Sequence, residues 1–173
     1  PVKSPTGLLA TLTIPQPARQ MENFAILLED IQDPGNLGAL LRTAAAAGVG
    51  AAYLSKGCTD AWSPKALRGG QGAHFLLAIH ERMVLPEVVG AFSGKVYAAA
   101  LGASTNLYQL DLRQAVAFVF GNEGSGLSPA LRSACHPFAV PMPGRVESLN
   151  VAAAAAVCLF ERVRQVQADA SGT

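Results

Sequence analysis

The chain has 173 residues, of which half are hydrophobic and 14% are charged, and its formal net charge is +1. This length and composition predict one folded domain with a substantial core and exclude a disordered chain. The near-neutral charge gives little sign of the basic surface that nucleic-acid binders usually carry. The longest apolar run, residues 151–160, is shorter than the roughly 20 residues needed to span a bilayer, so we expect no membrane partner.

The cysteines and histidines indicate no metal site. The cysteines are odd in number, scattered and without a C-x-x-C pair, which favours a reducing, cytoplasmic compartment and argues against zinc. The histidines have no ligand spacing with acids or cysteines, so we interpret them as structural. These residues are Cys58, Cys135 and Cys158, and His74, His80 and His136.

The N-terminal half has the pattern of a strand–helix–strand unit. A continuous apolar run at 24–29 is typical of a central parallel strand covered on both faces. A loop containing Pro34-Gly35 follows, and Asn36 is expected to cap a helix whose apolar residues repeat to Gly48. The next strand is predicted at 51–55, and an earlier one at 7–14.

The remaining segments continue this alternation less regularly. A short helix is predicted at 63–67, before a glycine-rich turn, and another near Ser128-Pro129. The other predicted elements are strands at 74–79, 95–100, 116–120 and 138–140, and a helix at 82–92. Together they predict an α/β domain with a mostly parallel sheet.

The last predicted strand leads into a long, alanine-rich helix. Ser148 stands where its hydroxyl would cap the first turn. The apolar residues that follow have the spacing of one buried helical face, and they are Val151, Ala154, Ala155, Cys158 and Leu159. Burial of this face does not explain why polar side chains gather at the mouth of so apolar a helix, which is a first indication of a site.

Ligands of parallel sheets bind at the carboxyl ends of the strands, where three loops have unusual composition. The loop GNEGSG, residues 121–126, has the glycines of an anion-binding turn. It lacks the Lys-Ser/Thr pair of a P-loop, and Glu123 would stand beside the phosphates. An adenosine, a ribose or a positively charged ligand therefore suits this loop better than a nucleotide phosphate.

The three loops together resemble a known family. DIQDPGNLGALLRTAAAAGV (30–49), FGNEGSGLSP (120–129) and VPMPGRVESLNVAAAAAVCLFE (140–161) resemble motifs 1, 2 and 3 of the SpoU (TrmH-type) RNA ribose methyltransferases, in the same order. The resemblance covers about residues 7–164. It implies a SPOUT fold, an α/β domain whose C-terminal segment forms a deep trefoil knot, although threaded chains are otherwise nearly absent. It also implies S-adenosylmethionine as cofactor, a homodimer, and methylation of a ribose 2′-hydroxyl in rRNA or tRNA.

The site residues follow from the resemblance, position by position. Arg42 would clamp a phosphate and stabilise the developing alkoxide, because a guanidinium does not readily lose a proton, and Asn36 would orient it. The residues matching the catalytic positions are Asn36, Arg42, Glu123, Ser148 and Asn150. The positions matching the cofactor site are Leu101, Gly121, Glu123, Gly124, Val140, Met142, Ser148 and Leu149.

The resemblance also suggests a domain organisation. Residues 24–173 would be the methyltransferase domain, and residues 1–23 a strand and linker following an RNA-binding domain that is missing here. The alternatives are an inactive RNA-binding scaffold of this fold, a knotted methyltransferase acting on a base, and a Rossmann oxidoreductase, whose G-x-G-x-x-G fingerprint the chain lacks.

Overall fold

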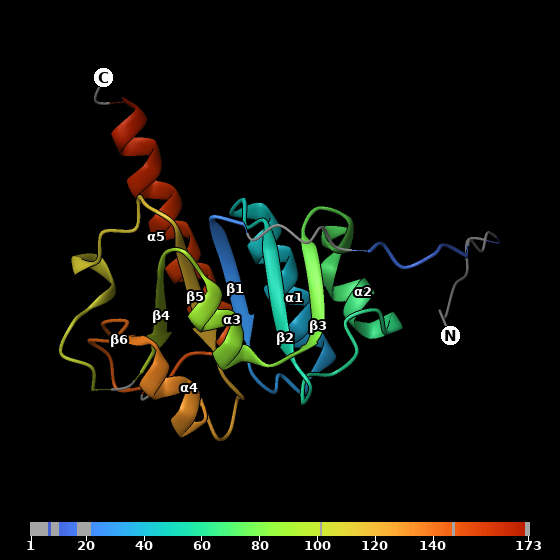
Figure 1. The fold of residues 1–173 in the computed structure, drawn as a ribbon, viewed down its shortest axis with the longest axis horizontal. Helices are drawn as coiled ribbons and strands as arrows, with labels where there is room; N and C mark the ends of the chain where they lie inside the picture. The colour runs from blue at the N-terminus through green and yellow to red at the C-terminus, as the bar shows by residue number, and fades with distance from the viewer. Residues whose placement is uncertain (1–6, 8–10, 17–21, 101, 147, 172–173) are drawn as a thin grey trace.

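A six-stranded parallel sheet forms the centre of the molecule (Figure 1). The computed structural model describes residues 7, 11–16, 22–100, 102–146 and 148–171. The strand order is β3-β2-β1-β5-β4-β6, and every neighbouring pair is parallel. The strands are β1 (Phe24–Leu28), β2 (Ala51–Ser55), β3 (Ala78–Met83), β4 (Lys95–Ala99), β5 (Val116–Phe120) and β6 (His136–Phe138).

The two central strands explain why the sheet is parallel and buried. All five residues of β1 and all five of β5 are buried. Their sequences, FAILL and VAFVF, are apolar at every position because helices cover both faces of the sheet. The strands run side by side from Phe24 opposite Val116 to Leu28 opposite Phe120, so the loops that follow them leave the sheet together.

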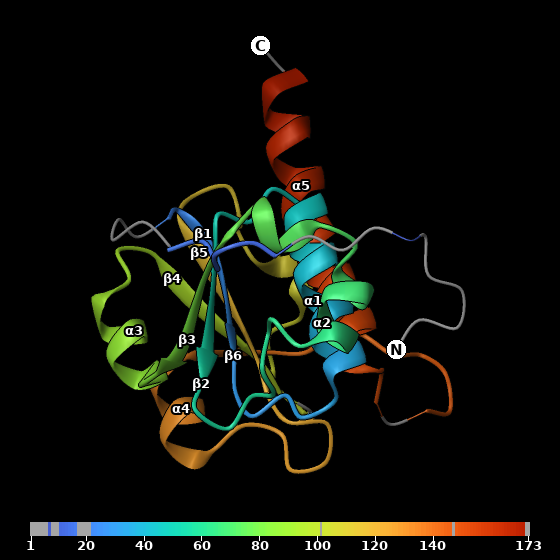
Figure 2. The same ribbon diagram turned by 90° about the vertical axis from the view of Figure 1, so that its right-hand side faces the viewer.

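Helices cover the two faces of the sheet (Figure 2). One face is covered by α1 (Pro34–Ala46), α2 (Pro64–Gly70) and α5 (Val151–Ser171), and the other by α3 (Leu85–Ala91) and α4 (Pro129–Ala134). Two apolar clusters result, one on each face. Two 3₁₀ turns, η1 (Ala73–Phe75) and η2 (Leu107–Gln109), complete the described elements.

Glycines allow α1 and α2 to pack backbone to backbone. A Cβ at Gly38 would lie 2.5 Å from the Ala66 carbonyl oxygen and 2.9 Å from the Gly69 Cα. A Cβ at Gly69 would lie 3.3 Å from the Gly38 Cα. Since no real Cβ fits at Gly38, this close crossing requires glycine there.

Both predicted caps of the two long helices are wrong. Asp33, not Asn36, caps α1, because the Asp33 side chain accepts from the Asn36 backbone N–H at 2.9 Å. Asn150, not Ser148, caps α5, since its Oδ1 accepts from the N–H of Ala152 at 2.9 Å. In each case the capping side chain and the expected one are both capable of capping, and sequence alone does not fix the register of the first turn. The predicted end of α1 is confirmed, with Gly48 at a φ of 78°.

Other predicted elements also differ from the structure. The strand predicted at 138–140 lies two residues earlier, as β6. Residues 8–10 of the expected strand at 7–14 lie outside the described part of the chain, and residues 11–14 form no strand. The strand predicted at 74–79 begins only at Ala78, because His74 and Phe75 belong to η1. The helix predicted at 82–92 begins at Leu85, because β3 continues to Met83.

A β-bulge explains the longer β3. The register with β2 shifts between Tyr53 and Ser55, and Arg82 has a φ of 58°. The extra residue turns Met83 toward the cluster beneath α3, where it packs against buried apolar side chains. Alternation by two would have placed Met83 on the opposite face, so periodicity gave no sign of this strand end.

Candidate active site at the carboxyl edge of the sheet

Three loops meet at the carboxyl edge of the sheet, where the strand arrows end in Figure 1. They follow β1, β5 and β6, and they lead into α1, α4 and α5 respectively. We call them the first loop (29–33), the second loop (121–128) and the third loop (139–150). The predicted site residues that the structure describes lie on these loops or in α1.

Three hydrogen-bonded side chains connect the second loop, α1 and the third loop. We call them the three-residue chain. The Asn150 Nδ2 donates to Asn36 Oδ1 at 3.1 Å, and the Asn36 Nδ2 donates to Glu123 Oε1 at 3.0 Å. These residues are 114 and 87 positions apart in the sequence. The structure therefore brings together three of the five predicted catalytic residues, one from each motif.

The direction of the hydrogen bonds fixes the orientation of both amides. The Asn150 Oδ1 is used as an acceptor by the first turn of α5, so only its amide nitrogen is left to donate to Asn36. Asn36 must then present its own nitrogen to Glu123. In both hydrogen bonds the donor is the residue farther from the Glu123 carboxylate. No hydrogen bond within the described residues uses Glu123 Oε2. That oxygen is available as an acceptor.

The second loop is held in shape by Asn122. Its Oδ1 accepts from the backbone N–H groups of Gly124 and Ser125, at 2.9 and 3.0 Å, and its Nδ2 donates to the Asp30 carbonyl at 2.9 Å. Gly121 closes the turn, because a Cβ there would lie 2.5 Å from the Gly126 carbonyl. The glycine is thus required by the loop's own backbone, a reason distinct from access for a ligand.

A second brace joins the second loop to the first loop. The Glu29 carboxylate accepts from the backbone N–H and from the hydroxyl of Ser128, both at 2.7 Å. The Ser128 hydroxyl also accepts from the N–H of Leu131 and so caps α4. The sequence reading missed Glu29, and its only signal was an acid directly after a buried strand.

Beyond Ala139, which bonds to Thr105 and Leu107, the third loop has no comparable brace. Among its described residues 141–146, 148 and 149, no side chain or backbone group makes a hydrogen bond. Ser148 and Leu149 are exposed, and Met142 and Val140 are half-buried. The backbone polar groups of this loop are therefore available to bind a ligand. Leu101, predicted to belong to the same site, lies outside the described residues.

Arg42 lies apart from the three-residue chain. It is exposed on α1, and it makes no hydrogen bond or ion pair with any described residue. Six positions separate it from Asn36, so the two side chains leave the helix in directions about 120° apart. Asn36 bonds to Glu123 and Asn150, and no hydrogen bond supports the expectation that it orients Arg42.

The charges near the site are mostly negative. The second loop carries Glu123, and the first loop carries Glu29, Asp30 and Asp33. The third loop carries Arg145. The backbone N–H of Asn36, followed by Lys65 at 3.0 Å, lowers the pKa of Asp33 below its usual value.

Within the described part of the chain, no group of His, Cys, Asp or Glu side chains has the arrangement of a metal site. No described helix is long and apolar enough to cross a membrane.

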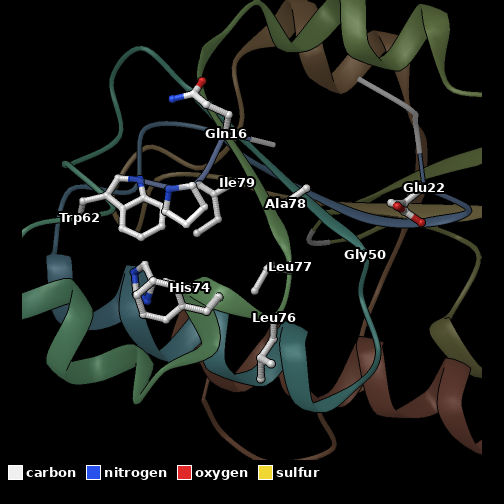
Figure 3. Close-up of a pocket in the computed structure, with 11 residues that line it drawn as sticks. Gln16, Glu22, Gly50, Trp62, His74, Leu76, Leu77, Ala78 and Ile79 are labelled. Atoms are coloured by element: carbon white, nitrogen blue, oxygen red, sulfur yellow. The ribbon is translucent and has the colours of Figure 1, made fainter. Parts of the chain in front are cut away.

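A cavity of about 380 Å³ lies elsewhere. Glu22, Gly50 and Ala78 line it near the amino ends of β1, β2 and β3, opposite the edge where the loops meet (Figure 3). Trp62 and His74 also line it, with ring centroids 5.3 Å apart. His74 is buried and its Nε2 is 2.7 Å from the Ala61 carbonyl oxygen, which agrees with a structural role.

Comparison with curated proteins finds RNA methyltransferases. A Synechocystis protein described as an uncharacterized tRNA/rRNA methyltransferase is 41% identical over 94% of this chain and 62% of its own length. The 23S rRNA (guanosine(2553)-2′-O)-methyltransferase RlmP of Bacillus subtilis is 36% identical over 91% of this chain and 65% of its own length. The chain thus spans less than two thirds of these relatives.

Solved structures give the same result. The SpoU methyltransferase AviRb from Streptomyces viridochromogenes has a TM-score of 0.81 at 27% identity, covering 90% of this chain and 66% of that one. An AdoMet-bound rRNA methyltransferase from Sinorhizobium meliloti has a TM-score of 0.78 at 31% identity, covering 87% and 59%. Residues 23–160 match the SpoU rRNA Methylase family, and the chain belongs to this family.

Proposed function

We propose that this chain transfers a methyl group from S-adenosylmethionine to the 2′-hydroxyl of a ribose in rRNA or tRNA. The observation that carries the proposal is the hydrogen-bonded chain Asn150–Asn36–Glu123, which joins the three motifs at one edge of the sheet. The names of the relatives support the reaction, since RlmP is a 2′-O-methyltransferase of 23S rRNA. The Sinorhizobium structure, which contains AdoMet, supports the cofactor.

The described residues fit this cofactor. A sulfonium is a cation, and Glu123 with the acids of the first loop gives the edge a negative charge. The backbone groups of residues 141–146, 148 and 149 in the third loop make no hydrogen bonds with described residues and can bind an adenosine, while Val140 and Met142 offer apolar contact. In this proposal Gly121, Gly124 and Leu149 complete the cofactor site, together with Leu101 and Ser148.

The site residues have different roles in the proposed reaction. The cofactor, when bound, supplies an activated methyl group, so the protein must position the ribose oxygen and help remove its proton. The free oxygen of Glu123 is the acceptor for that proton, and Asn36 holds the carboxylate in place. Arg42 clamps a neighbouring phosphate and stabilises the developing alkoxide. Ser148 orients the hydroxyl or the methionine part of the cofactor.

The assembly and chain path belong to the same proposal. We expect a homodimer, because α5 exposes Phe160 and Val166, at 47% and 37%, on a helix that extends beyond the sheet in Figure 1. We also expect the C-terminal segment to form the family's trefoil knot, residues 24–173 to act as the methyltransferase domain, and the protein to work in the cytoplasm. The absence of a disulfide among its cysteines supports the last point.

Calorimetry and a transfer assay test the proposal. The chain should bind S-adenosylmethionine and its demethylated product, and it should not bind NAD. Glu123→Gln should keep cofactor binding and lose about 10²–10³ in the rate of methyl transfer to unmodified rRNA, the cost of one group acting in the transition state. Full activity in Glu123→Gln would remove this residue from the reaction. Cofactor binding without transfer to any rRNA or tRNA would favour an RNA-binding scaffold instead.

A further inference from the structure

The described arginines fall into two groups according to their partners. Some are engaged within the protein: Arg113 with Asp111 at 2.8 Å, Arg164 with Glu161 at 2.8 Å, Arg132 with the Leu127 carbonyl, and Arg162 over the Phe24 ring. Arg42, Arg68, Arg82 and Arg145 differ from these, because all four are exposed and none has a side-chain partner among the described residues. Of these four, Arg42 and Arg68 lie on two helices that pack together. Their guanidinium groups are available to an anion.

The crossing of α1 and α2 places these two arginines on one surface. Gly38 contacts Gly69 at the crossing, and Arg68 directly precedes Gly69. Arg42 follows Gly38 by four residues, so it lies on the same side of α1, about 6 Å further along the axis. The backbone contact between the helices therefore brings together the stretches of α1 and α2 that carry the two arginines.

The charged side chains of α1 and α2 are all positive. The sequences PGNLGALLRTAAA of α1 and PKALRGG of α2 contain three cations and no acid. The cap residue Asp33 bonds to Lys65, whose side chain remains 64% exposed. We call the exposed surface of Arg42, Lys65 and Arg68 the α1–α2 basic face.

We propose that the α1–α2 basic face binds phosphates of the substrate RNA, with Arg68 as a phosphate-contacting residue beside Arg42. This inference rests on the proposed function, because it assigns part of the surface that the RNA substrate would occupy. A guanidinium donates two parallel hydrogen bonds to a phosphate, and two arginines on adjacent helices match a backbone with a charge at every nucleotide. The face begins at the first turn of α1, next to Asn36, so RNA bound there lies beside the proposed reaction site.

Salt-dependent RNA binding tests the inference. Binding of an unmodified in vitro transcript of 23S rRNA is measured at several salt concentrations for the unaltered chain, Arg68→Ala and Arg113→Ala. The control removes the same charge from an arginine that already has an acidic partner. Arg68→Ala should weaken binding about two- to fivefold and reduce the slope of log affinity against log salt by about 0.7–1, the value for one phosphate contact. Arg68→Lys should restore most of the slope.

The result for cofactor binding separates this inference from the proposed function. S-adenosylmethionine affinity and melting temperature should be unchanged in Arg68→Ala, because the Arg68 side chain makes no hydrogen bond or ion pair with a described residue and its backbone carbonyl, which accepts from Gln71, is kept. An unchanged salt slope in Arg68→Ala, or an equal change in Arg113→Ala, would overturn the inference and leave the proposed function intact. If the unaltered chain bound neither cofactor nor RNA, the proposed function would fail first.

Discussion

The second and third loops lie at the same edge of the sheet but are held in opposite ways. The second loop is fixed by Asn122 and by the Glu29–Ser128 brace, so Glu123 projects from a rigid turn. The described residues 141–146, 148 and 149 of the third loop make no hydrogen bonds until Asn150 caps α5. A reaction site needs both kinds of loop: a preorganised acceptor, and free backbone groups that a cofactor can use.

The largest effect should come from Asn150, which connects the third loop to Glu123 of the second loop through Asn36. Asn150→Asp keeps the oxygen that caps α5 but replaces the amide donor to Asn36 by a second oxygen. Stability should change little, because a carboxylate is a good N-cap. The rate of methyl transfer should fall about 10²–10³-fold, because Asn36 and Glu123 lose their orientation.

The control for this variant is Asn150→Ala, which should lose the cap as well. Its free energy of unfolding should drop by about 0.5–2 kcal/mol, as measured by urea denaturation. If Asn150→Asp retained full transfer activity, the hydrogen-bonded chain would have no role in the reaction.

A methyl group at Gly121 should disrupt the braced loop. Gly121→Ala would place a Cβ 2.5 Å from the Gly126 backbone, so the loop must shift. We expect a loss of about 1–3 kcal/mol in the free energy of unfolding together with weaker cofactor binding. The matched control in the third loop is Gly144→Ala, whose Cβ would meet no atom within 4 Å. Equal losses in the two variants would contradict the contrast between the loops.

Removing the Glu29 brace should have a smaller effect. Glu29→Ala leaves the half-buried N–H and hydroxyl of Ser128 without their acceptor, which costs about 1–3 kcal/mol. A double-mutant cycle with Ser128→Ala should show coupling, since the two side chains form one contact. Strictly additive losses would mean that the two residues act independently.

The smallest expected effect concerns pH. The pKa of Asp33 is lowered in the folded protein, so the stability this carboxylate contributes is present above its unfolded pKa and is lost as pH falls through its folded pKa. Asp33→Asn can still cap α1 but cannot pair with Lys65 or titrate. The difference in unfolding free energy between the unaltered chain and Asp33→Asn should therefore shrink as the pH is lowered from 7 to 3. A difference that stayed constant would contradict this role.

Sequence patterns were most informative where one face or one motif decides the structure. The buried strands β1 and β5 were predicted because continuous apolar runs of this length suit a strand covered on both faces. The motifs predicted that Asn36, Glu123 and Asn150 belong to one site, and the hydrogen bonds join all three.

The remaining features depend on contacts between distant residues. Glu29 and Ser128 are 99 positions apart, and nothing local in either segment indicates their bond. The resemblance placed Gly121 in the cofactor site, and it gave no sign that a Cβ there would clash with the backbone of Gly126 in the same loop. The end of β3 depends on a bulge at Arg82, which alternation cannot predict.

The most direct test of the central claim locates the transferred methyl group. The chain is incubated with S-adenosylmethionine carrying an isotopically labelled methyl group and, in separate reactions, with unmodified 23S rRNA and with unmodified tRNA. The RNA is then digested to nucleosides and analysed by mass spectrometry. We expect a labelled nucleoside whose extra mass stays with the ribose fragment, formed about 10²–10³ times more slowly by Glu123→Gln. Label on the base fragment would contradict ribose methylation, and no label in rRNA or in tRNA would contradict methyl transfer by this chain.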